Sequence, residues 1–442
     1  MKAKNTITKY REKLKHNIFF QNIAVVTGGN VTAKLVGIIA APIITRLYTP
    51  EDYGIFSVFL SVVGVVGSLA TLRYAITIPI AKEEKLADNI LKLCFLITIS
   101  LSIAWFIGIA LFGKILTVQL SAEQLQPYLW LMPVVFLSKG IYEALNNWAV
   151  RSRNFKIITR TKISQGVSSA GVKIGLGALR ITPLGLFIGQ IAQDGAGITS
   201  LLSKLVSVKP DFFKSFSWKE IKFAANRYKK FPLVQSWSQL LLALGAQLPV
   251  LLIGAFYGVE VVGVFGLAQS MINMPMNLIG QSVAQVYYAE ISKYGKNNPG
   301  KIYNLSISII KKLFWIGLIP VGIIALFGPW LFSLVFGSEW QDAGLYARYF
   351  SLVILTRFIS SPVTNIFNVF ELQGLQLTLN IARVIIITII FSLSNFLNFS
   401  AKEAMILYGI IMPIYSIIGL YILYKILING KSKRKSTQND YS

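Results

Sequence analysis

The sequence reads YTPEDYGIF at Tyr48–Phe56 and, at an offset of 209 residues, YGVEVVGVF at Tyr257–Phe265. Both stretches follow one pattern, Tyr-x-x-Glu-x-x-Gly-(Ile/Val)-Phe. In this pattern the glycine suits a tight turn, and the aromatic rings suit a membrane–water interface. The offset is nearly half of the 442 residues. A loop repeated at this distance predicts that the chain consists of two similar halves.

The residues around the repeat have the composition of a membrane protein. The chain is 54% hydrophobic and 14% charged, with a mean hydropathy of +0.60, which is too apolar for a soluble domain of this length. A helix crosses the hydrocarbon layer of roughly 30 Å with about 20 apolar residues. The sequence predicts twelve spans, at residues 19–45, 54–81, 89–112, 128–150, 163–180, 184–206, 232–256, 261–290, 306–336, 342–371, 375–394 and 404–428.

The basic residues behind the net charge of +25 are distributed unequally between the two predicted sides of the membrane. With the N-terminus in the cytoplasm, thirty-two Lys and Arg fall in the inner loops and segment ends, and four fall in the outer ones. This asymmetry follows the positive-inside rule and predicts that both termini are cytoplasmic. It also favours membrane lipids, and not nucleic acid, as the partner of the basic runs.

Twelve spans divide into six plus six, and the repeated loops then follow the first and the seventh span on the same side. This is a parallel repeat, in which the two halves are related by an axis along the membrane normal. We therefore predict an all-α membrane protein with two six-helix bundles around a shared cavity. The predicted segments are a basic N-terminal segment at 1–18, bundles at 19–206 and 232–428, an amphipathic linker at 207–231 and a basic tail at 429–442.

Catalytic and metal-binding patterns are scarce. The chain has one His, His16, and one Cys, Cys94, and it has neither a metal-ligand cluster nor a phosphate-binding loop for ATP. We expect no enzyme activity, no metal and no cofactor. A membrane-embedded polymerase or ligase is a distant alternative, because it would require a larger outer loop than 113–127, the longest one predicted.

The informative residues are the charges inside the spans. Ionisable groups at membrane depth are costly, so each should face water or a partner. Seven are cationic and two are acidic: Lys34, Arg73, Lys139, Lys173, Arg348, Arg357 and Arg383, against Glu143 and Asp194. Lys139 and Glu143 are spaced i,i+4, which predicts an ion pair on one helix face. The remaining excess of positive charge suits an anionic substrate.

Polar residues recur at steps of three and four in the first, eighth and tenth spans. They indicate either a lining for an aqueous cavity or polar packing between helices. The predicted lining comprises Asn30, Gln269, Asn273, Asn277, Gln281, Ser361, Thr364 and Asn368. The cations of the first hairpin are not repeated, because Lys34, Arg46 and Arg73 correspond to Ala243, Ala255 and Ser282 in the second half.

The stretch RLYTPEDYGIFSVFLSVVGVVGSLATLRYAITIPIAKEE, Arg46–Glu84, resembles the first hairpin of Wzx-type oligosaccharide flippases, a branch of the MATE/MOP superfamily. The resemblance implies a V-shaped cavity through which an undecaprenyl-pyrophosphate-linked oligosaccharide crosses the bacterial cytoplasmic membrane by alternating access. It also implies a role in surface polysaccharide synthesis, coupling to a proton or sodium gradient, and a polysaccharide polymerase and chain-length machinery as partners. Members often carry a carboxylate directly after the Arg-Tyr pair, where this chain has Ala75.

The expected substrate contacts are therefore the cations Lys34, Arg46, Arg73, Lys173, Arg357 and Arg383. Arg46 and Arg73 rest on the match to the hairpin, and Lys34 rests on depth and spacing. Asp194 and Glu143 are the candidates for the coupling ion, although Asp194 lies beside two glycines and can equally be a helix-packing residue. A lipid II flippase and a multidrug or ion antiporter of the same superfamily remain alternative functions.

Overall fold

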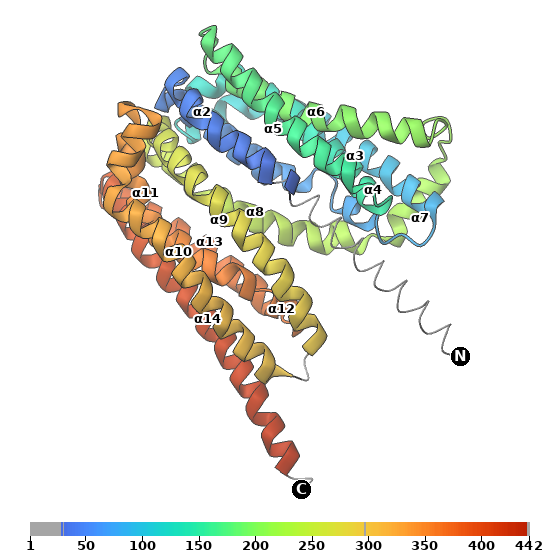
Figure 1. The fold of residues 1–442 in the computed structure, drawn as a ribbon. Coiled ribbons are helices and arrows are strands. Elements are labelled where there is room, and N and C mark those ends of the chain that lie inside the picture. The colour runs from blue at the N-terminus through green and yellow to red at the C-terminus, as the bar shows by residue number, and fades with distance from the viewer. Residues whose placement is uncertain (1–27, 30, 296–297, 440–442) are drawn as a thin grey trace. The chain divides into compact units, whose positions relative to one another are not determined.

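The structure is a computed structural model that describes residues 28–29, 31–295 and 298–439, with side chains through Ile428. No strand occurs in these ranges (Figure 1). A first long helix covers residues 31–47. The others are α2 (Pro50–Val66), α3 (Glu84–Gln119), α4 (Leu131–Arg151), α5 (Phe155–Ala178), α6 (Leu184–Val208), α8 (Ser236–Tyr257), α9 (Val259–Tyr294), α10 (Pro299–Phe336), α11 (Gln341–Val363), α13 (Gln373–Phe396) and α14 (Ala401–Asn439).

Short elements connect these helices. They are the 3₁₀ turns η1 (Gly67–Leu69), η2 (Tyr74–Thr77), η3 (Glu123–Tyr128) and η5 (Ser338–Trp340), the π-helical turn η4 (Phe231–Gln235), and the short helices α7 (Trp218–Arg227) and α12 (Ile366–Val369). The ten-residue helix α7 lies within the predicted linker.

The long helices confirm the predicted all-α membrane fold class. Within the described ranges, a long helix occupies the position of each of the twelve predicted spans. Eight are long and apolar enough to cross a membrane by length and composition. The other four are α4, α5 and α6, which carry the charges of Lys139, Lys173 and Asp194, and the first helix, of which residues 31–47 are described continuously.

The prediction of one continuous second span at 54–81 is wrong. Helix α2 ends at Val66, and residues 67–83 form turns in which Leu72 and Arg73 adopt positive φ angles of 45° and 62°. This conformation strains residues that carry a Cβ. Two residues accompany the break: Gly67 begins it, and Pro79 within it has no backbone N–H to donate to a helical hydrogen bond.

By its internal contacts the chain forms two compact units. Unit 1 comprises residues up to Leu47, Val62–Ile115 and Leu125–Leu240, and unit 2 comprises Tyr48–Ser61, Leu116–Gln124 and the residues from Leu241 onward. In unit 1, α4 and α5 pack against α6. In unit 2, α11 packs against α9, α10 and α14 (Figure 1).

The two copies of the repeated loop pack directly against each other inside unit 2. A Cβ on Gly54 of α2 would lie 1.7 Å from the carbonyl oxygen of Val259, and a Cβ on Gly263 of α9 would lie 1.8 Å from that of Pro50. Pro50 and Val259 are themselves related by the 209-residue offset, so the contact is reciprocal. Both glycines are helical, and the tight turn predicted for them is therefore wrong.

The aromatic residues of the loop also differ from the prediction. Tyr48 is 2% exposed, so it belongs to the core and not to the surface at a membrane interface. Tyr53 packs edge-on against Trp340, with 5.5 Å between the ring centroids. The repeated motif is thus a helix-packing motif of unit 2.

Candidate functional site

A cavity of about 250 Å³ lies inside unit 2, among α8, α11, α13 and α14. We call it the arginine cavity, because Arg357 of α11 and Arg383 of α13 both line it. Its other polar lining residues are Ser360, Ser361, Thr364, Gln376, Asn380, Tyr415 and Ser416. Its apolar lining is Leu242, Val353, Phe367, Leu379, Met412, Leu420 and Leu423, with Gly419.

Helical periodicity explains how the polar residues converge. Arg357, Ser361 and Thr364 follow each other at steps of four and three, and so do Gln376, Asn380 and Arg383, so each triplet lies on one face of its helix. The Tyr415 hydroxyl of α14 donates to the carbonyl oxygen of Leu379 at 2.6 Å, which fixes α14 against α13 beside the cavity.

The arginine cavity is electropositive, and no carboxylate among the described residues serves as a counterion in it. No Asp or Glu lines it, and neither Arg357 nor Arg383 forms an ion pair with a described carboxylate. The two guanidinium groups are close enough to repel each other. Arg383 Nε is buried and has no hydrogen-bond partner among the described residues. Because unpaired charge at membrane depth is costly, this arrangement suits an anionic ligand.

A second cavity of about 100 Å³ shares Arg357 and Ser361 with the first. Helix α9 supplies Asn273, Asn277 and Gln281 to its lining. Two of the predicted polar stripes, those of the eighth and tenth spans, therefore meet at Arg357. The two cavities together offer two guanidinium groups surrounded by amides and hydroxyls, which is suited to a phosphate group carrying sugars.

Unit 1 holds a different charged site, which we call the charge cluster: Arg73, Lys139, Glu143, Lys173 and Asp194. Arg73 Nη1 lies 3.9 Å from Glu143 Oε1, and the Thr71 hydroxyl donates to Glu143 Oε2 at 3.3 Å. The direct ion pair predicted between Lys139 and Glu143 is not formed, because the ion-pair partner of Glu143 is Arg73; Lys139 attracts Glu143 only from a longer distance. The reason is the break after α2, which turns Arg73 toward α4.

Glycines and lysines build the rest of the charge cluster. The side chain of Lys139 lies against Gly67, and that of Lys173 lies against Gly189, where a Cβ would come within 2.4 Å of it. Asp194 is hydrogen-bonded to Gln190, and its carboxylate is attracted by Lys139, Lys162 and Lys173. In contrast to the arginine cavity, the cations of this cluster have carboxylates close by.

The other predicted site residues lie as follows. Lys34 is half-buried, with Lys162 as a like-charged neighbour, and Arg46 is exposed and donates to the carbonyl oxygen of Pro42. Gln269 and Asn368 line neither the arginine cavity nor the second cavity. Asn30 lies outside the described residues.

Five polar lining residues of the arginine cavity are absent from the prediction: Gln376, Asn380, Tyr415, Ser416 and Ser360. The sequence contained a signal for the first two, because they precede Arg383 at helical steps. Tyr415 and Ser416 carry no such signal, since their helix presents no polar stripe.

The family is decided by a sequence comparison. Residues 43–344, more than half of the chain, match the profile of a family described as polysaccharide biosynthesis protein. The chain belongs to this family. None of the curated protein sequences is significantly similar to it.

Solved structures identify the fold of this family member. A MATE transporter of the MOP superfamily in its inward-facing conformation aligns with a TM-score of 0.72 and 16% identity, over 90% of this chain and 96% of that one. An outward-facing MATE transporter aligns with a TM-score of 0.57 and 18% identity, over 93% and 96%. A MOP transporter from Pyrococcus furiosus, described by the reverse polarity of its binding pocket, aligns with a TM-score of 0.52 and 16% identity, over 93% and 95%.

Identities this low establish the fold alone. The chain has the MATE/MOP transporter fold, as the sequence predicts, and it belongs to a polysaccharide biosynthesis family. Together with the eight candidate spans, fold and family indicate a multi-pass membrane protein.

Proposed function

We propose that this chain is a flippase that moves undecaprenyl-pyrophosphate-linked oligosaccharides from the inner to the outer leaflet of the bacterial cytoplasmic membrane. The observation that supports the proposal best is the arginine cavity, where Arg357 and Arg383 have no carboxylate partner among the described residues. A pyrophosphate supplies the missing negative charge. The planar guanidinium group suits it because it donates two parallel hydrogen bonds to a phosphate.

The remaining lining suits the rest of such a substrate. Sugar hydroxyls can exchange hydrogen bonds with Gln376, Asn380 and Tyr415 in the arginine cavity, and with Asn273 and Asn277 in the second cavity. The polyprenyl chain stays in the lipid. Alternating access then releases the glycolipid into the outer leaflet, where a polysaccharide polymerase and its chain-length machinery take it up for O-antigen, capsule or exopolysaccharide synthesis.

The charge of the cavity lining also bears on the two alternative functions, a multidrug exporter and a lipid II flippase. A multidrug exporter for cationic compounds would need acidic groups in the cavity, and the described lining has none. The Pyrococcus furiosus relative is itself described as having a binding pocket of reverse polarity that suggests a different function. A lipid II flippase would use the same chemistry with a smaller sugar portion, so the donor lipid has to be distinguished by experiment.

Complementation of a strain that lacks its own oligosaccharide flippase tests the proposal. We expect the intact chain to restore surface polysaccharide. Arg357→Gln or Arg383→Gln should lower the amount restored by about tenfold or more, since a hydrogen bond to a charged group contributes about 1.5–3 kcal/mol. Arg348→Gln is the matched control, because Arg348 lies on the same helix, donates to the carbonyl oxygen of Leu326 and lines neither cavity. Equal polysaccharide with all three variants, at matched membrane levels, would contradict the assignment of the cavity.

A further inference from the structure

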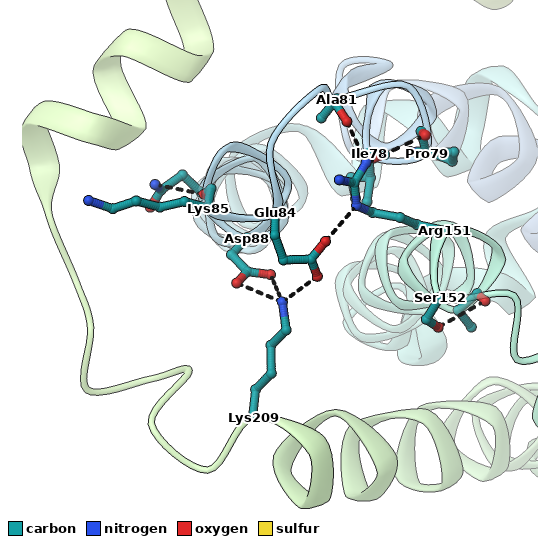
Figure 2. A network of polar contacts seen from close by, with 11 residues as sticks. Ile78, Pro79, Ala81, Glu84, Lys85, Asp88, Arg151, Ser152 and Lys209 are labelled. Atoms are coloured by element: carbon teal, nitrogen blue, oxygen red, sulfur yellow. Dashed lines mark hydrogen bonds and ion pairs between the residues drawn. The ribbon is translucent and has the colours of Figure 1, made fainter.

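The segment 209–230, which joins α6 to the next predicted span, contacts the rest of unit 1 along one side. Figure 2 shows its first residue, Lys209, whose ammonium group points toward Glu84 and Asp88. Lys209 Nζ lies 2.7 Å from Glu84 Oε1 and 2.7 Å from Asp88 Oδ2, and Arg151 Nε donates to Glu84 at 3.1 Å. Burial alone would lower the pKa of Lys209, but hydrogen bonds to Asp88 and Glu84 outweigh burial and raise the pKa, so Lys209 stays charged.

Helix α7 is docked by the same side. Glu220 pairs with Lys85 and accepts from Asn89 at 2.9 Å, and the Tyr74 hydroxyl donates to the carbonyl oxygen of Ala225 at 3.0 Å. Ile221 and Ala224 of α7 are buried in the core of unit 1. The inner side of α7 is therefore fully committed to the fold.

The opposite side has no such contacts. Phe213, Phe216, Trp218 and Phe223 are each more than half exposed. Five basic residues of the segment are also exposed and form no ion pair with a described carboxylate: Lys219, Lys222, Arg227, Lys229 and Lys230. We call these nine residues the outward face of the linker. The acidic residues of the segment, Asp211 and Glu220, are both paired with lysines.

The chain connectivity places this face at a bilayer surface. Lys209 directly follows the last residue of α6, the helix at the sixth span predicted from the sequence, and a helix that is long and apolar enough to cross a membrane begins at Phe231. The linker therefore joins a predicted membrane span to a candidate membrane span. At the surface of a bilayer, aromatic rings settle at headgroup depth and lysines and arginines approach lipid phosphates.

We propose that the outward face of the linker binds the headgroup layer of a bilayer that contains anionic phospholipids. A cavity of about 250 Å³ between α3 and α7 adds a place for one headgroup. Phe223 and Arg227 border it together with Lys82 and Lys85. Its lining also has two acidic residues, Glu83 and Glu220, of which Glu220 pairs with Lys85, so basic residues outnumber acidic ones by three to two. A lipid phosphate between Lys82 and Arg227 would leave an acyl chain against Phe223. This inference does not depend on the identity of the transported substrate.

A fluorescent probe on the full-length chain tests the proposal. Cys94 is buried and is the only cysteine, so Phe223→Cys in a Cys94→Ser chain accepts a single environment-sensitive label. The protein is placed in nanodiscs of phosphatidylcholine, alone or with phosphatidylglycerol. With phosphatidylglycerol we expect a blue shift of the emission, strong quenching by brominated lipid, and loss of quenching by iodide in the water.

Charge reversal tests whether the basic residues of the outward face cause the response to phosphatidylglycerol. Lys219→Glu, Lys222→Glu and Arg227→Glu together should abolish the phosphatidylglycerol-dependent change. The control carries Lys301→Glu, Lys311→Glu and Lys312→Glu, three exposed residues of α10 with the same total charge change, and it should behave like the parent. An equal loss in the control would overturn the proposal, because it would reflect net charge alone.

Two further outcomes would also overturn it. Iodide quenching that is the same in both lipids would show that the outward face stays in water. A label protected from iodide and from brominated lipid alike would show that another part of the chain covers the face. If the reversed variant unfolds, Lys219→Gln, Lys222→Gln and Arg227→Gln replace it, with the same expected loss.

Discussion

At the scale of single residues, two arginines of this chain have opposite surroundings. Arg73 lies 3.9 Å from the carboxylate of Glu143, whereas Arg383 is close to the like charge of Arg357 and has no carboxylate partner among the described residues. A buried cation that is paired with a carboxylate needs no further counterion. A buried cation without such a partner favours the binding of an anion. This difference favours unit 2 as the place where an anionic substrate binds.

The carboxylates of the charge cluster lead to a prediction about coupling. Asp194 is surrounded by Lys139, Lys162 and Lys173 and is hydrogen-bonded to Gln190. If Asp194 binds the coupling proton or sodium ion, Asp194→Asn keeps the size of the side chain but removes its charge. We expect this variant to transport at a rate that no longer responds to an imposed ion gradient.

Transport measured in vesicles with and without a gradient checks this prediction. Glu143→Gln is the comparison, because Glu143 already forms an ion pair with Arg73. We expect this variant to keep the dependence of transport on the gradient. A response to the gradient that survives in Asp194→Asn would refute the coupling role and support helix packing as the role of Asp194.

The residue types of the site could largely be predicted from sequence, but their pairing could not. Arg357, Ser361 and Asn273 follow from polar residues at helical steps in apolar spans, and Arg383 follows from its charge inside such a span. The contact between Arg73 and Glu143 does not, because it depends on the break after Val66 and joins elements about seventy residues apart in the sequence. Periodicity describes one helix at a time, and such contacts need the tertiary structure.

At the scale of elements, the repeated loop shows how a correct pattern can receive the wrong local interpretation. A glycine beside aromatic residues was expected to form a turn, yet Gly54 and Gly263 let α2 and α9 approach each other closely. Both roles require the absence of a Cβ, so the sequence alone does not separate them. Repetition of the motif, however, correctly indicated equivalent elements in the two halves.

This contact predicts the effect of small substitutions. Gly54→Ala or Gly263→Ala places a Cβ within 2 Å of a backbone carbonyl oxygen on the facing helix. Overpacking of this kind typically costs ~1–3 kcal/mol, so each variant should melt several degrees below the parent in detergent. Gly322→Ala in α10 is the control, because a Cβ there meets no atom within 4 Å. Equal melting temperatures for Gly54→Ala and Gly322→Ala would argue against the close approach.

At the scale of the whole molecule, the family profile and the fold each cover most of the chain. The family profile covers residues 43–344, and the MATE/MOP fold extends over about nine-tenths of the chain. Composition and apolar periodicity were sufficient to predict this architecture, because a membrane restricts helical chains to long apolar spans. They could not reveal the transported molecule, since specificity depends on the few polar groups that line a cavity.

The most direct test of the proposed function follows the glycolipid itself across a membrane. Proteoliposomes are prepared with undecaprenyl-pyrophosphate-linked oligosaccharide in both leaflets, and periodate, which stays outside, oxidises the sugars that it reaches. We predict that the intact chain makes the inner-leaflet half accessible, so that oxidation approaches completion, whereas Arg357→Gln with Arg383→Gln leaves that half protected. An intact, folded chain that leaves oxidation at the level of empty liposomes would contradict the account.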